Sequence, residues 1–231
     1  MKTIGLIGGM SWESSAEYYR IINQQVQKRL GGVHSAKCVM YSVDFAEIET
    51  LQHEDRWEEA ADILRRAGES LASAGADFFV LCTNTMHQLL PAIEEDMDIP
   101  YLHIADATAE KIRERSLRTI GLLGTKFTME GDFYRGRLES KFRLDVVIPD
   151  AEDREIVHNV IYEELVQGKI DADSKSKYLA IVDKLIDAGT EGIILGCTEI
   201  GLLIKDGDRA VPFFDTTEIH AEAAVEYALT D

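Results

Sequence analysis

The sequence is poor in several features that define common classes of protein. It has 3 cysteines in 231 residues, too few for a disulfide framework, so reduced thiols and a cytoplasmic location are expected. No apolar run reaches the length of a membrane span. The 24 basic residues are outnumbered by 42 acidic ones, and the formal net charge of -18 repels nucleic acid and anionic membranes. A small acidic substrate stays possible, because a local site can differ in sign from the whole surface.

The motifs of common cofactor and metal sites are also missing. The glycines after the first apolar run do not have the G-x-G-x-x-G spacing of a dinucleotide site, and there is no P-loop. No lysine stands in a recognisable cofactor-linking context. Cys82, His87 and Cys197 lack the close spacing of metal ligands, so no metal site is expected.

Short apolar runs alternate with longer amphipathic stretches along the chain. This alternation predicts an α/β fold built on parallel sheets. The strands are expected at residues 4–7, 38–43, 78–81, 120–123, 146–148 and 193–195. The helices are expected at residues 14–30, 57–74, 108–115, 153–167, 174–188 and 217–228.

The two halves of the chain resemble each other in three places, which follow in the same order in each half. Any one match could arise by chance, but three in order favour a duplicated α/β domain. The matching segments are 3–8 with 119–124, 71–81 with 185–195 without a gap, and 99–101 with 211–213.

Duplication predicts two similar, Rossmann-like parallel-sheet domains with a substrate cleft between them. We expect the first domain to span residues 1–103 plus 213–231 and the second to span 104–212. Ligands of open parallel sheets bind beyond the carboxyl ends of the strands. The loops expected there are 8–11, 82–85, 124–126 and 196–199.

Cys197 follows the apolar run 193–196, at the expected end of a strand. A helix N-terminus after it would favour the thiolate, which can act as nucleophile or base. A buried apolar cysteine is the alternative. The ungapped repeat puts Thr83 in register with Cys197, and Cys82 in register with Gly196. Because adjacent strand residues point to opposite faces, we expect Thr83 to face the cleft and Cys82 to face the core.

Polar residues follow Thr83 directly. Asn84, Thr85 and the backbone N–H groups of a helix start suit an anion such as a carboxylate. Capping of the helix is the alternative, and capping and binding can coexist. His87 is expected to be a packed or surface histidine and not a ligand.

These segments together resemble the aspartate/glutamate racemase family, and the resemblance covers nearly the whole chain. Segments 8–14, 81–87 and 104–108 are similar to an L-aspartate/glutamate-specific branch of that family. The motifs that carry the resemblance are Gly8-Gly9-Met10, Thr83-Asn84-Thr85-Met86-His87 against the family's C-N-T-A-H, and Gly196-Cys197-Thr198-Glu199 against its G-C-T-E.

The resemblance implies a homodimer of two-domain chains that racemises aspartate or glutamate without pyridoxal phosphate or any other cofactor. In the family, two facing cysteines remove and return the α-proton. The second cysteine corresponds to Cys197, and the first falls on Thr83, so an asymmetric and L-selective site is expected. The residues expected to bind substrate are Met10, Gln52, Asn84, Thr85, Thr198 and Glu199.

Two other functions stay open. One is a related isomerase, decarboxylase or hydantoin racemase with a similar cysteine site. The substrate of the isomerase or the decarboxylase would be a dicarboxylate. The other is a non-catalytic amino-acid or dicarboxylate binding protein. The choice between aspartate and glutamate is open too, and Arg20, Lys126 and Arg135 are equal candidates for holding the distal carboxylate.

Overall fold

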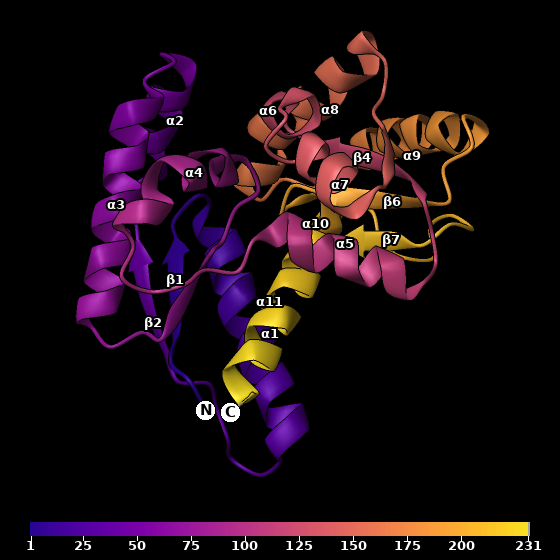
Figure 1. The fold of residues 1–231 in the computed structure, drawn as a ribbon. Helices are drawn as coiled ribbons and strands as arrows, with labels where there is room; N and C mark the ends of the chain where they lie inside the picture. The colour runs from indigo at the N-terminus through magenta and orange to yellow at the C-terminus, as the bar shows by residue number, and fades with distance from the viewer. Residues whose placement is uncertain (231) are drawn as a thin grey trace. The chain divides into compact units, whose positions relative to one another are not determined.

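The computed structural model describes residues 1–230 and contains two parallel sheets, each in a compact unit of its own (Figure 1). The first unit comprises Met1–Ile104 together with the chain from His220 onward, and the second comprises Ala105–Ile219. The predicted α/β class with two parallel sheets is confirmed. No helix within residues 1–230 is long and apolar enough to cross a membrane.

The first unit is built on a sheet with the strand order β2-β1-β3. Tyr101 extends this order by a parallel bridge to Phe79. Its elements are β1 (Ile4–Gly8), α1 (Trp12–Leu30), β2 (Cys38–Ser42), α2 (Phe45–His53), α3 (Trp57–Ser73), β3 (Phe78–Leu81), the short helices η1 (Thr85–Leu89), α4 (Leu90–Ile93) and η2 (Glu94–Asp96), and most of α11 (Thr216–Leu229).

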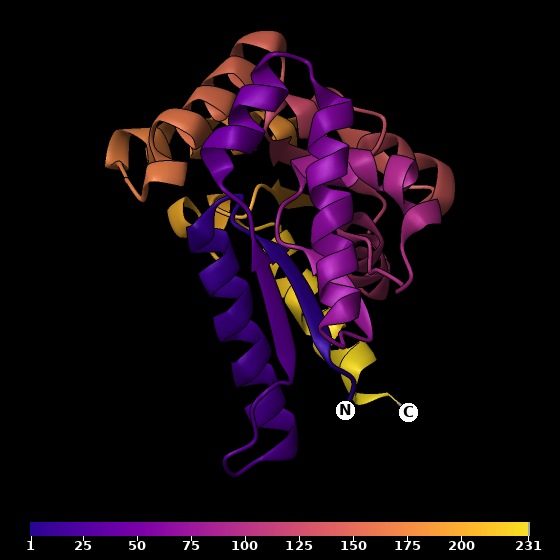
Figure 2. The ribbon, with the colours of Figure 1, turned by 90° about the vertical axis from the view of Figure 1, so that its left-hand side faces the viewer.

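Both faces of this sheet are buried, as is usual for parallel strands. Alternate residues of β1 serve the two faces: Ile4 and Leu6 pack with α1 and α11, and Ile7 packs with α2 and α3. Figure 2 shows the strands running between α1 and α3. β2 differs from the expected buried strand, because it pairs on one side only and leaves Met40 and Tyr41 each 39% exposed.

The second unit is built on a sheet with the order β5-β4-β6-β7, all parallel. Its elements are α5 (Ile104–Glu114), β4 (Thr119–Gly124), α6 (Lys126–Glu130), α7 (Arg135–Phe142), β5 (Asp145–Val147), α8 (Ala151–Glu163), η3 (Leu165–Gln167), α9 (Ala172–Asp187), β6 (Gly192–Gly196), α10 (Ile200–Leu203), β7 (Phe213–Asp215) and the first turn of α11.

The chain returns to the first unit later than the sequence suggested. A boundary at residue 213 was expected, but Phe213 pairs with Ile193, so β7 belongs to the second sheet. The crossing lies inside α11, between Ile219 and His220. The outward crossing follows Ile104.

The internal repeat is visible as matching hydrogen bonds in the two units. The backbone N–H of Asp77 donates to the carbonyl of Thr3 over 2.9 Å, and that of Glu191 donates to the carbonyl of Thr119 over 2.8 Å. The carboxylates of Asp77 and Glu191 accept from the backbone N–H of the same two threonines. The sequence matches between the two halves therefore correspond to the same strand register in the two sheets.

The match continues to the strand ends. Phe79 donates to the carbonyl of Pro100 over 2.9 Å, and its counterpart Ile193 donates to the carbonyl of Pro212 over 3.0 Å. The sequence alignment of the two halves has no insertion between these bonded residues and the loops that follow. Thr83 and Cys197 therefore hold equivalent positions, each at the end of a strand in its own unit.

Candidate active site

Thr83 lies just past the end of β3 and is buried. Cys82 donates its backbone N–H to the carbonyl of Ile7 over 2.9 Å, which prolongs the pairing of β3 with β1 up to the residue before Thr83. Asn84 stands at the N-cap of η1, but its side chain makes no capping hydrogen bond to it. The buried side chains of Asn84 and Thr85 follow Thr83 at the carboxyl end of the sheet.

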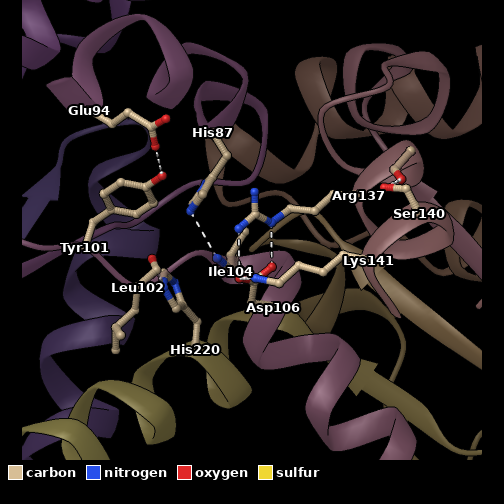
Figure 3. Close-up of polar contacts among 11 residues, drawn as sticks. His87, Glu94, Tyr101, Leu102, Ile104, Asp106, Arg137, Ser140, Lys141 and His220 are labelled. Atoms are coloured by element: carbon tan, nitrogen blue, oxygen red, sulfur yellow. Dashed lines mark hydrogen bonds and ion pairs between the residues drawn. The ribbon is translucent and has the colours of Figure 1, made fainter. Parts of the chain in front are cut away.

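His87 holds the backbone of this loop. Its Nδ1 lies 2.8 Å from the carbonyl oxygen of Thr83. Its Nε2 accepts the backbone N–H of Ile104 over 3.2 Å, as Figure 3 shows. A carbonyl oxygen can only accept and an amide N–H can only donate, so the ring is neutral with its proton on Nδ1. Burial, and then the nearby His103 and His220, lower the pKa of His87 far below its ordinary value.

A second buried histidine, His220 on α11, makes a similar pair of bonds. Its Nδ1 accepts from the hydroxyl of Tyr18 on α1 over 2.9 Å. Its Nε2 donates to the carbonyl of Leu102 over 3.0 Å, and Figure 3 shows His220 beside Leu102. Burial lowers the pKa of His220 to about 4. Nothing in the spacing of the sequence pointed to this residue, because its partners come from distant segments.

Met10 and Gln52 lie in the first unit, near the loop after β3. Met10 belongs to the same buried apolar cluster as Met86. Gln52 on α2 is 5% exposed and donates its amide to the sulfur of Met86 over 2.9 Å. The structure thus joins Gln52 to the segment that carries Thr83 through the side chain of Met86, and it places Met10 in the same cluster.

In the second unit, Cys197 follows the end of β6 and is half-buried. Its thiol donates to Oε2 of Glu199 over 3.0 Å. The hydroxyl of Thr198 donates to the same oxygen over 2.8 Å. Glu199 is only 3% exposed, so a buried carboxylate faces the thiol directly.

This arrangement keeps Cys197 protonated at rest. Burial, and next the negative charge of Glu199 and the hydrogen bond to it, raise the pKa of the thiol far above its ordinary value. The backbone N–H groups of Thr198 and Glu199 act in the opposite direction but are outweighed. The expected thiolate is therefore wrong for the resting protein: α10 is a single turn, and the carboxylate dominates.

Strand register fixes which loop of the neighbouring strand lies level with Cys197. Gly124 at the end of β4 pairs with Gly196 at the end of β6, so Thr125 follows at the level of Cys197. A side chain at Gly124 would place its Cβ 2.8 Å from the carbonyl oxygen of Gly196, which only glycine avoids. The sequence indicated this loop, and in the structure the hydroxyl of Thr125 caps α6 by accepting the backbone N–H of Thr128 over 3.2 Å.

Cys82 directly precedes Thr83, but its thiol faces the core and not the polar loop. Cys82 is wholly buried in the apolar cluster under α1 and α11, and burial strongly raises the pKa of its thiol. Cys38 is half-buried on β2. Within the described part of the chain, no group of three or more His, Cys, Asp or Glu side chains is arranged to hold a metal ion.

Each basic residue proposed to hold a distal carboxylate already has an acidic partner. A carboxylate of the substrate would therefore have to compete with a residue of the protein. The pairs are Arg20 with Glu17, Lys126 with Glu155, and Arg135 with Glu139.

Asp106 on α5 forms ion pairs with two basic side chains of α7. Nε and Nη2 of Arg137 donate to its two carboxylate oxygens over 2.5 and 2.8 Å, and Nζ of Lys141 donates over 2.6 Å (Figure 3). One carboxylate between two cations leaves a local positive charge on α5 and α7. The segment 104–108, which includes Asp106, was one of those that carried the sequence resemblance.

The fold and the polar strand ends define a duplicated α/β protein with a thiol–carboxylate pair in one half. The chain belongs to the Asp/Glu/hydantoin racemase family, which matches residues 7–224. The resemblance seen in the sequence is thereby confirmed. Family membership supports a racemase of acidic amino acids.

Solved structures and curated proteins agree with this assignment. A Yersinia pestis protein provisionally described as an Asp/Glu racemase is 54% identical, with a TM-score of 0.93 over 100% of both chains. An aspartate racemase homologue from Pyrococcus horikoshii is 37% identical, with a TM-score of 0.87 over 100% of both chains. The broad specificity amino-acid racemase RacX of Bacillus subtilis is 21% identical over 96% of both chains.

Acid is expected to destabilise the protein through His220. The pKa of about 4 in the folded state lies below the ordinary value of about 6.5, so the unfolded state binds more protons between these two pH values. The free energy of unfolding should fall as the pH falls through this window. His220→Gln removes the titration and should flatten the slope by up to about 1.4 kcal/mol per pH unit.

Urea unfolding at several pH values measures this slope. The control is His34→Gln, the same exchange at an exposed position. An equal change of slope in both variants would contradict the assignment to His220.

Proposed function

We propose that the protein is a cofactor-independent racemase of aspartate and glutamate, in which Cys197 serves one face of the α-carbon and Thr83 serves the other. The observation that carries the proposal is the Cys197 thiol hydrogen-bonded to the buried Glu199 at a strand end. The equivalence of Thr83 and Cys197 in the internal repeat supports the pairing of these two residues. All three cysteines are free, which suits a cytoplasmic enzyme, and the family resemblance suits a homodimer.

Glu199 gives the resting thiol a route to the reactive thiolate. Transfer of the Cys197 proton to Glu199 over the 3.0 Å bond yields a thiolate and a neutral carboxyl group. The thiolate then takes the α-proton, which restores the thiol and leaves a carbanion on the substrate. The positive charge of an incoming substrate ammonium would stabilise the thiolate that forms.

The carbanion needs donors that are already oriented toward the substrate carboxylate. We assign this role to the backbone N–H groups of the two strand-end loops, at Asn84-Thr85 and Thr198-Glu199. Met10 and Gln52 would line the wall of the pocket. These residues bind and orient the substrate, while Cys197 and Thr83 exchange the proton.

The two faces of the reaction are chemically unequal. A threonine hydroxyl ionises far less readily than a thiol, so it supplies almost none of its basic form at neutral pH. The repeat also sets Thr85 where the second unit has Glu199, so no carboxylate stands at that position in the loop after Thr83. Thr83, or a water molecule that it holds, therefore returns a proton more readily than it removes one, so the site favours one enantiomer. The sequence resemblance to the L-specific branch of the family makes this the L-enantiomer.

Thermodynamics limits what L-selectivity can mean. The two enantiomers have equal free energy in solution, so forward and reverse kcat/KM must be equal for net racemisation. A selective enzyme can still exchange the α-proton of one enantiomer quickly while inverting it rarely. Fast exchange with slow inversion is therefore the expected behaviour.

Deuterium exchange followed by NMR, with all four enantiomers of aspartate and glutamate and no added cofactor, tests this proposal. We expect rapid exchange into one enantiomer and slow net inversion. Equal and fast exchange into both enantiomers would show that Thr83 does not make the site asymmetric. Chiral chromatography of the products separates a racemase from an isomerase or decarboxylase. A lack of exchange, with ligand affinity kept in Cys197→Ser, would favour a binding protein.

Replacing the weak base should rescue the slow face. Thr83→Cys is expected to raise exchange of the sluggish enantiomer by on the order of 100-fold, the usual contribution of a positioned acid–base group. Cys82→Ser is the control and should leave both rates unchanged. If Cys82→Ser abolishes activity and Thr83→Ala does not, Cys82 is the second base.

One substitution separates two effects of Glu199: its action as a proton acceptor, and the effect of its negative charge on the pKa of Cys197. Glu199→Gln keeps an acceptor for the thiol and removes the negative charge, so the pKa of Cys197 should fall. Exchange of the α-proton should nevertheless drop by on the order of 100-fold, because the proton acceptor is lost. The pH dependence of iodoacetamide alkylation, with Cys197→Ser as the blank, measures the pKa. A rise in both alkylation and exchange would show that Glu199 only holds the thiol in its resting state.

A further inference from the structure

Two buried histidines hold the segment Leu102–Ile104, through which the chain leaves the first unit. His87 accepts the backbone N–H of Ile104 over 3.2 Å, and His220 donates to the carbonyl of Leu102 over 3.0 Å. The ring of His87 lies 4.7 Å from that of His103 and 5.7 Å from that of His220. Figure 3 shows both bonds at the start of α5.

His87 also reaches the proposed reactive loop. Its Nδ1–H donates to the carbonyl oxygen of Thr83 over 2.8 Å. A single neutral ring therefore joins the peptide plane after Thr83 to the backbone of Ile104. The two bonds use opposite edges of the ring, so moving either segment alone would break one of them.

The position of the Thr83 backbone has consequences for chemistry. Strand pairing reaches Cys82, whose N–H bonds to Ile7, and the helix η1 begins only at Thr85. Thr83 thus falls between two regular elements, where a side-chain bond can set the direction of the backbone. A displacement of about 1 Å at a reacting group can cost on the order of 100-fold in rate.

We propose that His87 is a positioning residue for the Thr83 face of the reaction, acting through its bond to the Thr83 carbonyl while its other nitrogen is fixed by Ile104. The proposal rests on the proposed function, since it assumes that Thr83 takes part in proton transfer. In this proposal Nδ1 orients the Thr83 backbone and Nε2 anchors the ring to Ile104. A histidine that only filled space in the core would not need a separate partner for each nitrogen.

Two substitutions separate the two nitrogens. His87→Asn retains a donor near the place of Nδ1 and loses the acceptor for Ile104. His87→Gln places an amide oxygen near Nε2 and loses the donor to Thr83. Each variant therefore keeps one of the two bonds, and the two variants differ little in size and polarity.

The readout compares the two faces of the substrate. In His87→Gln we expect net inversion to fall by about tenfold or more, with exchange of the fast enantiomer at Cys197 changed less than about twofold. In His87→Asn the ratio of inversion to exchange should stay near that of the unmodified protein. The control is His34→Gln, at an exposed position, which should change neither rate.

Several outcomes would overturn the proposal. An equal loss of both rates in both His87 variants would show a purely structural role, and unchanged rates in both would show no role.

The ring of the unmodified protein gives a second test by ¹⁵N NMR between about pH 5 and 8, in case the variants do not fold. We expect a proton on Nδ1 throughout, and a proton on Nε2 would refute the geometry. If the unmodified protein exchanges no α-proton, the proposed function fails, whereas the NMR result for His87 stands or falls by itself.

Discussion

Parallel pairing of the central strands is the constraint on which the rest of the structure depends. Pairing of β1 with β3 and of β4 with β6 puts the carboxyl ends of each pair at one edge of a sheet. Both faces of the central strands are covered by apolar side chains, so polar chemistry is confined to the loops at that edge. Thr83 and Cys197 are the first residues beyond the buried ladders, each in its own unit.

A duplicated scaffold does not require duplicated chemistry. The same backbone bonds recur in both units, from Thr3 and Thr119 to Pro100 and Pro212. The side chains placed at equivalent strand ends nevertheless differ, because the fold constrains the backbone there and leaves the side chain open. One unit therefore has the Cys197 thiol bonded to the buried carboxylate of Glu199, and the other has Thr83, whose backbone carbonyl is bonded to His87.

Periodicity and the internal repeat predicted much of the fold, including β3 at residues 78–81 and the equivalence of Thr83 with Cys197. Where prediction failed, tertiary contacts decided the result. β7 was assigned to the wrong domain because its pairing with β6 cannot be read from its own residues. The resting thiol was missed because the orientation of the Glu199 side chain toward Cys197 is a tertiary detail. The role of His220 depends on partners that are distant in sequence, and that of His87 depends on the orientation of its ring between Thr83 and Ile104.

The two histidines show why a neutral imidazole suits such a link. It presents a donor and an acceptor on opposite edges, whereas an amide side chain presents both at one end. His87 carries its proton on Nδ1, and His220 carries its proton on Nε2, so the two rings use opposite tautomers to bind one exit segment. Burial lowers the pKa of each ring, and with it the chance that a second proton would turn an acceptor into a donor. The same burial that keeps these rings uncharged therefore preserves, at neutral pH, the bonds in which His87 accepts from Ile104 and His220 accepts from Tyr18.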